Sequence, residues 1–213
     1  MRVRDVRVLD VTVSLVALAV LAPLLLLVAV AVKYSSPGPV LYRARRAGQY
    51  GRPFTLYKFR SMVVGAPGSG PRITGTGDSR ITEVGRILRR TKLDELPQFF
   101  NTLKGDMSLV GPRPEDPALV ETYSADQRRL LTVKPGITSP ATVLNRYEEE
   151  LLSGPDPEAA YRRDVLPRKL RMELEYLDRR TVGEDLRVLG HTVLALFARR
   201  ARLGVDRGSE WRI

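Results

Sequence analysis

Two adjacent carboxylates, Asp94 and Glu95, are the first candidates for chemistry in this sequence. They follow a predicted helix and precede Pro97, a residue favoured in the first turn of a helix, so we expect both near a helix N-terminus. The positive end of the helix dipole favours ionised carboxylates there. That is the form required of a nucleophile or a metal ligand. The alternative is that both acids only cap the helix.

Lys58 and Arg60 are candidates for binding phosphate groups. They lie two residues apart in a predicted strand, 54–60, and therefore share one face of it. Two cations side by side suit a diphosphate. A solvated strand face would give the same pattern, and these residues alone do not separate the two interpretations.

Arg89 and Arg113 are two further candidate phosphate ligands. Arg89 lies near the end of a predicted helix, 82–90, and Arg113 lies between two prolines that restrict how the backbone presents it. The only histidine, His191, has no acidic or cysteine neighbour, and the chain contains no cysteine. Thiolate chemistry, disulfides and histidine-based metal or triad sites are therefore excluded.

The elements that must position these side chains are mainly α-helical, with a small β-hairpin. Residues 40–43 and 54–60 read as short strands around the Gly48–Pro53 turn. Residues 157–180 read as a charged helix with a leucine stripe. Residues 65–78 contain five glycines without the Walker spacing, which predicts a mobile loop. The last helix, 186–203, has an apolar stripe and a basic end, typical of an interfacial membrane helix or of a core helix with a basic tail.

Charge defines the classes of partner. The 213 residues carry a net charge of +11, which suits nucleic acid, anionic lipid head groups or phosphorylated small molecules. We find no nucleic-acid recognition motif and no set of aromatic side chains for base stacking, so nucleic acid is not expected as a partner. Anionic membrane lipids and phosphorylated substrates remain.

The segment 11–32 carries no charge and is long enough to cross a bilayer. A cleaved signal peptide would have a shorter apolar core. A single span conflicts with the positive charge on both flanks, because the positive-inside rule requires one flank to be depleted. A third interpretation satisfies both flanks: the helix enters the membrane, bends at Pro23 and returns to the same face. We favour this re-entrant anchor.

Six motifs in this order resemble those of the bacterial sugar transferases known as monotopic phosphoglycosyl transferases. Together with the proline-interrupted apolar segment that precedes them, the resemblance covers about residues 8–140. The motifs are Ser36-Pro37-Gly38-Pro39, Tyr57-Lys58-Phe59-Arg60-Ser61-Met62, Leu93-Asp94-Glu95-Leu96-Pro97-Gln98, Gly105-Asp106-Met107-Ser108, Gly111-Pro112-Arg113-Pro114 and Lys134-Pro135-Gly136-Ile137-Thr138. The Leu-Asp-Glu-Leu-Pro-Gln and Gly-Pro-Arg-Pro motifs are the most specific.

The resemblance implies a reaction. Such an enzyme moves a phosphosugar from a nucleoside diphosphate sugar, usually a UDP-sugar, onto polyprenol phosphate with Mg²⁺ as its metal. Asp94 would attack the sugar-linked phosphorus, form a covalent phosphosugar intermediate and release UMP. Glu95 would assist, with both acids near the metal, and Lys58, Arg60, Arg89 and Arg113 would bind phosphate oxygens.

The same resemblance implies an architecture and a location. Residues 1–34 would form the re-entrant helix-break-helix anchor, bent at Pro23. Residues 35–213 would form a compact cytoplasmic catalytic domain with C-terminal interfacial helices at about 182–203. The expected location is the cytoplasmic face of the bacterial plasma membrane, with both termini in the cytoplasm. The sequence leaves open whether the chain forms a homodimer.

Two departures from the family pattern stand out. The bend has Ala22-Pro23 where relatives commonly have Ser-Pro, which removes a hydroxyl able to bond a freed backbone group. After Thr138 the chain reads Ser139-Pro140-Ala141 where many relatives have Gly-Leu/Trp-Ala. We take this as the mark of a subfamily with its own sugar preference, set by 65–80 and 139–165. The competing hypothesis is a catalytically silent scaffold or anionic-lipid-binding protein with the same fold.

Overall fold

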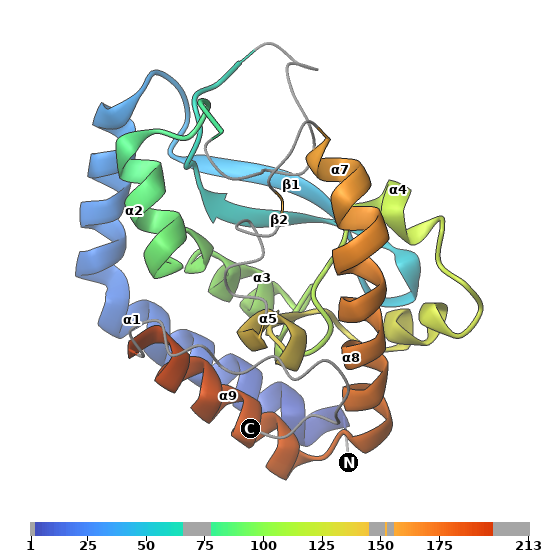
Figure 1. Cartoon of the computed structure of the whole chain (residues 1–213). Coiled ribbons are helices and arrows are strands. Elements are labelled where there is room, and N and C mark those ends of the chain that lie inside the picture. Colours follow the sequence, from blue (N-terminus) through green and yellow to red (C-terminus); the bar gives the residue numbers. More distant parts are fainter. Residues whose placement is uncertain (1–2, 66–77, 145–151, 153–155, 198–213) are drawn as a thin grey trace.

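The computed structural model describes residues 3–65, 78–144, 152 and 156–197 (Figure 1). Three expectations fall partly or wholly outside these residues: most of the glycine-rich loop, part of the 139–165 region, and the basic end of the last helix at Arg199, Arg200 and Arg202. The described chain is mostly helical and contains two small sheets.

The N-terminal helix α1 (Val3–Ser35) contains Pro23 in its interior and runs without interruption. Figure 1 shows it as two limbs that meet at an angle. The expected break in the helix is therefore a bend, because proline removes only one hydrogen bond and its ring displaces the preceding turn. The segment from Val6 to Ser35 is long and apolar enough to cross a bilayer, and few of its residues are buried.

The first limb of α1 is attached to the core by two polar residues. Arg7 donates to the backbone oxygens of Thr102 and Leu103, the latter at 2.7 Å. Asp10 Oδ1 accepts from the Ser108 hydroxyl at 3.0 Å and from the Leu109 amide at 2.9 Å. These contacts fix the start of the helix on elements about a hundred residues away in the chain.

The second limb is attached by apolar packing. Val28 and Val32 are buried against Phe59 and Leu88. Large apolar side chains of α1 that face away from the core are exposed, among them Leu15, Val16, Val20, Leu26 and Leu27. An exposed apolar surface of this extent is typical of a helix that contacts lipid.

The hairpin predicted from the sequence is confirmed. Strands β1 (Leu41–Ala47) and β2 (Pro53–Phe59) pair in antiparallel register, with Arg43 opposite Tyr57. Helix α2 (Glu83–Thr91) begins where the sequence predicts a helix, because the Thr82 hydroxyl accepts from the Gly85 amide.

A second sheet was not predicted. Strand β3 (Ser108–Val110) pairs in parallel with β4 (Gly136–Thr138). The two backbones approach so closely that a Cβ on Gly136 would lie 2.1 Å from the Gly111 amide nitrogen. Gly111 begins the Gly-Pro-Arg-Pro loop, so the β3–β4 pair sets the path of that loop.

The C-terminal part forms a helical column along one side of the core, and its last helix lies at the bottom of the view in Figure 1. The helix predicted at 157–180 is present as α7 (Pro157–Ala160), one wider π-helical turn and α8 (Leu166–Arg179), with the leucine stripe packed inward. In the sequence, the short helix α4 (Pro117–Val120) lies between β3 and β4, and the short helix α5 (Pro140–Leu144) follows β4. Helix α9 (Val182–Phe197) buries Val188 and exposes apolar side chains that include Leu186, Val193 and Leu194.

Candidate active site

Asp94 and Glu95 lie in a short 3-10 turn, Leu93–Glu95, between α2 and α3 (Gln98–Lys104). Lys92 reverses the chain at the end of α2 by adopting a left-handed conformation with φ of 60°, and its amide donates to the Arg89 carbonyl. This turn directs both carboxylates into the protein, where Asp94 is 7% and Glu95 9% exposed. A place at the start of a helix does not by itself require burial, so the burial of both acids is a separate feature of this site.

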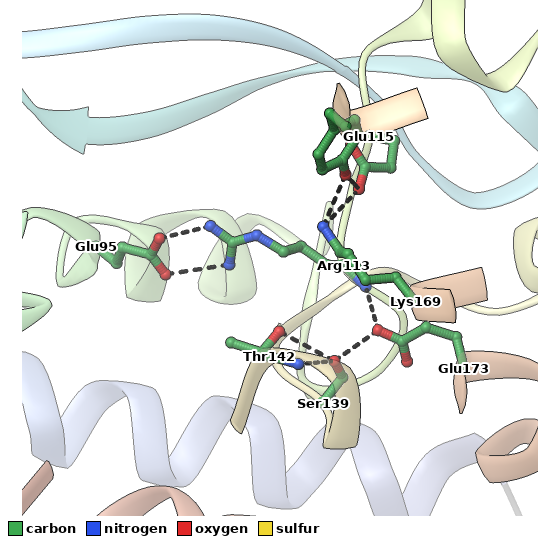
Figure 2. Close-up of polar contacts among 8 residues, drawn as sticks. Glu95, Arg113, Glu115, Ser139, Thr142, Lys169 and Glu173 are labelled. Atoms are coloured by element: carbon green, nitrogen blue, oxygen red, sulfur yellow. Dashed lines mark hydrogen bonds and ion pairs between the residues drawn. The ribbon is translucent and has the colours of Figure 1, made fainter. Parts of the chain in front are cut away.

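Glu95 is held by two cations. Lys58 Nζ lies 2.8 Å from Oε1, and Arg113 reaches both carboxylate oxygens, at 2.6 Å and 3.3 Å (Figure 2). Burial would raise the pKa of Glu95, but Arg113 and Lys58 outweigh it and hold that pKa well below its ordinary value. Glu95 is therefore ionised and fixed in place.

Asp94 lies in a different environment. Its Oδ1 is buried and has no hydrogen-bond partner among the residues that the structure describes. Burial raises the pKa of Asp94, with the charge of Glu95 acting in the same direction, while Lys58, Lys92 and Arg89 oppose the rise. The expected lowering by the helix dipole is outweighed, because desolvation of a buried carboxylate is the larger effect.

The sequence-predicted phosphate ligands do not all gather here. Lys58 and Arg113 contact Glu95, and Arg89 is close enough for its charge to lower the pKa of Asp94. Arg60 lies elsewhere: its guanidinium donates to the carbonyls of Val32, Ser36 and Pro37 at 3.1, 2.6 and 3.1 Å. Val32 lies in the last turn of α1, and Ser36 and Pro37 follow it directly. The last carbonyls of a helix lack intrahelical partners and form its negative end, which attracts this cation.

Two residues of the site had not been singled out from the sequence. Lys92 is one of the cations around Asp94, and its only sequence signal is its place directly before the Leu-Asp-Glu motif. Asn101 of α3 ties the hairpin to the site: its side chain accepts from the Tyr57 amide at 3.0 Å and donates to the Thr55 carbonyl at 2.7 Å. These bonds fix the strand that carries Lys58.

The surroundings of the two carboxylates indicate which of them could hold the expected Mg²⁺. No group of three or more acidic or histidine side chains suited to a metal occurs among the described residues. Mg²⁺ is usually held by one or two carboxylates together with substrate phosphates. Asp94 fits this pattern through its unpartnered oxygen, whereas both oxygens of Glu95 are engaged by cations.

Comparisons of the sequence with known proteins show which proteins this chain is similar to. A family model described as "Bacterial sugar transferase" matches residues 3–199. The UDP-glucose:undecaprenyl-phosphate glucose-1-phosphate transferase of Caulobacter vibrioides is 38% identical over 193 residues, which cover 89% of this chain and 68% of that protein. The exopolysaccharide production protein PSS of Rhizobium leguminosarum bv. phaseoli is 37% identical over 200 residues, 91% of this chain and 95% of that protein.

A third relative is much longer. The UDP-N-acetylgalactosamine-undecaprenyl-phosphate N-acetylgalactosaminephosphotransferase of Aeromonas hydrophila is 42% identical over 144 residues, which cover 66% of this chain. The matched part spans only 34% of that protein. The similarity therefore concerns a common region of relatives that differ in total length.

Proposed function

The chain belongs to the bacterial sugar transferase family, and on that premise we propose that it transfers a phosphosugar from a UDP-sugar to polyprenol phosphate. The observation that carries this proposal is the site itself. A buried carboxylate with one unpartnered oxygen, Asp94, lies beside a second, Glu95, that two cations fix in its ionised form. Phosphoryl transfer depends on such positioning and charge neutralisation.

The proposed reaction has two displacements at one phosphorus atom. In the first, a carboxylate oxygen of Asp94 attacks the sugar-linked phosphorus, and the bond to the bridging oxygen breaks and releases UMP. In the second, a phosphate oxygen of polyprenol phosphate attacks the same phosphorus and displaces the carboxylate. The products are polyprenyl diphosphate sugar and regenerated Asp94.

The surrounding groups have separate roles in this scheme. Glu95 holds Lys58 and Arg113 at the site, and these cations, with Arg89, bind the phosphate oxygens of the substrate. Mg²⁺, held through the unpartnered oxygen of Asp94 together with the diphosphate, would neutralise charge on the leaving group. Burial keeps water from the Asp94 carboxylate, which leaves it less solvated and more reactive.

Membrane attachment completes the proposal. We assign α1 as a re-entrant anchor, so that residues 35–213 and both termini lie on the cytoplasmic side. The exposed apolar side chains of α1 and α9 would contact lipid, and the net charge of +11 would favour anionic head groups. The site would then meet a soluble nucleotide sugar and a lipid phosphate at one interface.

One experiment tests the reaction. The protein in nanodiscs is incubated with Mg²⁺, undecaprenyl phosphate and either UDP-glucose or UDP-N-acetylgalactosamine, and UMP is measured. We expect UMP from the wild type and from Asp126→Asn, a surface control, but none from Asp94→Asn. With the lipid omitted, intact-mass analysis should find a phosphosugar adduct on the wild type and on Asp126→Asn, but not on Asp94→Asn. Absence of UMP above Asp94→Asn across a panel of UDP-sugars would favour a silent scaffold.

A further inference from the structure

A buried polar network lies behind Arg113, on the side away from Glu95 (Figure 2). Its centre is a pair of charged residues on α8, Lys169 and Glu173, which are 4% and 3% exposed. Residues four apart in a helix share one face, so this pair projects together toward the Gly-Pro-Arg-Pro loop. The reaction proposed above assigns no task to either residue.

The pair holds the loop on both sides of Pro114. Glu173 Oε1 accepts from the backbone amide of Arg113 at 3.4 Å. Lys169 Nζ donates to Glu115 Oε1 at 3.0 Å and to the Tyr161 hydroxyl at 2.8 Å, and that hydroxyl donates to Glu115 at 2.7 Å. Residues 113 and 115 are therefore both bonded to the C-terminal helical column.

Ser139 connects this network to α5. Its hydroxyl donates to Glu173 Oε1 at 2.6 Å and accepts from the Thr142 amide at 3.0 Å, which caps α5. The serine of the unusual Ser139-Pro140-Ala141 sequence thus bonds the same carboxylate oxygen that bonds Arg113. This contact gives the departure from the family pattern a role in holding the loop, whereas the sequence had suggested a role in choosing the sugar.

Stability alone does not account for these buried charges. Burial raises the pKa of Glu173 to about 7, with the Ser139 and Arg113 hydrogen bonds opposing the rise, and its Oε2 has no partner among the described residues. A buried carboxylate with an unbonded oxygen costs free energy, and a well-packed apolar side chain would often be at least as stable. A buried charged cluster kept at this cost suggests that it holds another group in a fixed position.

We propose that Glu173 is a positioning residue for Arg113. By fixing the backbone amide between two prolines, it sets the point from which the guanidinium reaches both oxygens of Glu95. Lys169 fixes the following residue, Glu115, and so prevents the loop from rotating about Pro114. The consequence for catalysis rests on the proposed function, since it requires that Arg113 bind the substrate phosphates.

Hydrogen exchange tests the positioning without any assay of activity. Because residues 112 and 114 are prolines, a peptide spanning 111–115 reports on few amides, and the Arg113 amide is one of them. Glu173→Leu should accelerate exchange in this peptide, while exchange in α3 should stay unchanged. Glu173→Gln, which keeps an acceptor oxygen, should exchange close to the wild-type rate. Unaltered exchange in Glu173→Leu overturns the proposal.

Kinetics then test whether Glu173 acts through Arg113. Glu173→Leu should lower kcat/KM for UMP release about tenfold in the wild type but less than about threefold in an Arg113→Lys background, because residues acting through one another are not additive. The matched control is Glu175→Leu, on the opposite side of α8, which should leave kcat/KM unchanged. Losses that multiply in the double variant overturn the proposal.

The proposal stays testable if the Glu173→Leu variant does not fold or if the wild type is inactive. If Glu173→Leu does not fold, Glu173→Asp enters both tests, since it keeps the charge but is one methylene too short to reach Arg113 and Ser139 together. If the wild type releases no UMP from any UDP-sugar, the proposed function fails. The exchange experiment then still decides whether Glu173 positions the loop.

Discussion

Asp94 and Glu95 are adjacent in the chain, yet the protein shifts their pKa values in opposite directions. Both are buried, so the difference comes from their partners: Arg113 and Lys58 bond Glu95 directly, while cations act on Asp94 only through space. Two neighbouring carboxylates with divergent pKa values commonly have separate roles. Here the ionised, fixed acid organises the cations and the other is left able to react.

The pH dependence of activity should depend on Lys58. In the proposed reaction the carboxylate of Asp94 must be ionised to attack phosphorus, so activity should fall as the pH drops through its pKa. Burial raises that pKa, and Lys58 is the largest influence opposing the rise. Lys58→Met should therefore move the acid limb of the kcat/KM profile to higher pH, in addition to lowering its maximum. Lys104→Met, at a half-exposed lysine of α3, should leave the limb in place.

Glu173 makes stability depend on pH in a defined direction. Its pKa rises from an ordinary 4.5 to about 7 on folding, so the native state binds more protons than the unfolded chain between these values. Stability must then fall as the pH rises through this window, by on the order of 3 kcal/mol at most. Glu173→Gln should unfold at a higher temperature than the wild type at pH 8, and the difference should be much smaller at pH 5, close to the lower end of this window. An equal difference at both pH values would contradict the assignment.

At the scale of elements, local signals predicted the structure well. The hairpin, the helix α2 predicted at 82–90 and the leucine stripe of α8 each follow from residues close together in the chain. The parallel β3–β4 pair escaped prediction because each strand has three residues and the partners are distant in sequence. The α8 network escaped for a related reason: a charged helix pattern does not show which of its charges will be buried.

The contacts of Arg60 show how tertiary structure can override a local sequence pattern. Period two puts Lys58 and Arg60 on one strand face, which suggested a shared phosphate. The strand ends at Phe59, however, and the end of α1 lies near enough for Arg60 to bond the Val32 carbonyl in its last turn and the two carbonyls of Ser36 and Pro37 that follow the helix. No reasoning from the hairpin alone could place the end of α1 there.

Arg60→Met should accordingly destabilise the protein more than it impairs catalysis. Loss of three charge-assisted bonds at the end of α1 should cost about 2 kcal/mol or more and lower the unfolding temperature by several degrees. The kcat/KM per folded molecule should remain within about threefold of wild type. Arg43→Met, on the exposed face of β1, should change neither quantity. A large loss of kcat/KM without loss of stability would show that Arg60 acts in substrate binding.

For the whole molecule, the proposed re-entry of α1 predicts that the N-terminus and the core lie on the same side of the membrane. The bent helix and its exposed apolar surface agree with re-entry, and the chain contains no cysteine, which permits single-cysteine labelling. Cysteines added at the N-terminus and at Tyr50 of the hairpin turn should both react with an impermeant maleimide from the cytoplasmic side only. Tyr50 serves as the reference for the core. Labelling of the two positions from opposite sides would establish a span.

The attachment of α1 at both ends constrains how the protein is made. Asp10 bonds residues that lie 98 and 99 positions later in the chain, and Arg7 bonds carbonyls 95 and 96 positions later. The first limb of α1 therefore leaves the ribosome about a hundred residues before its polar partners do, and these bonds can form only once the later elements exist. Under the proposed membrane attachment, α1 would reach the bilayer first, and the later elements would assemble against a helix already held at the membrane surface.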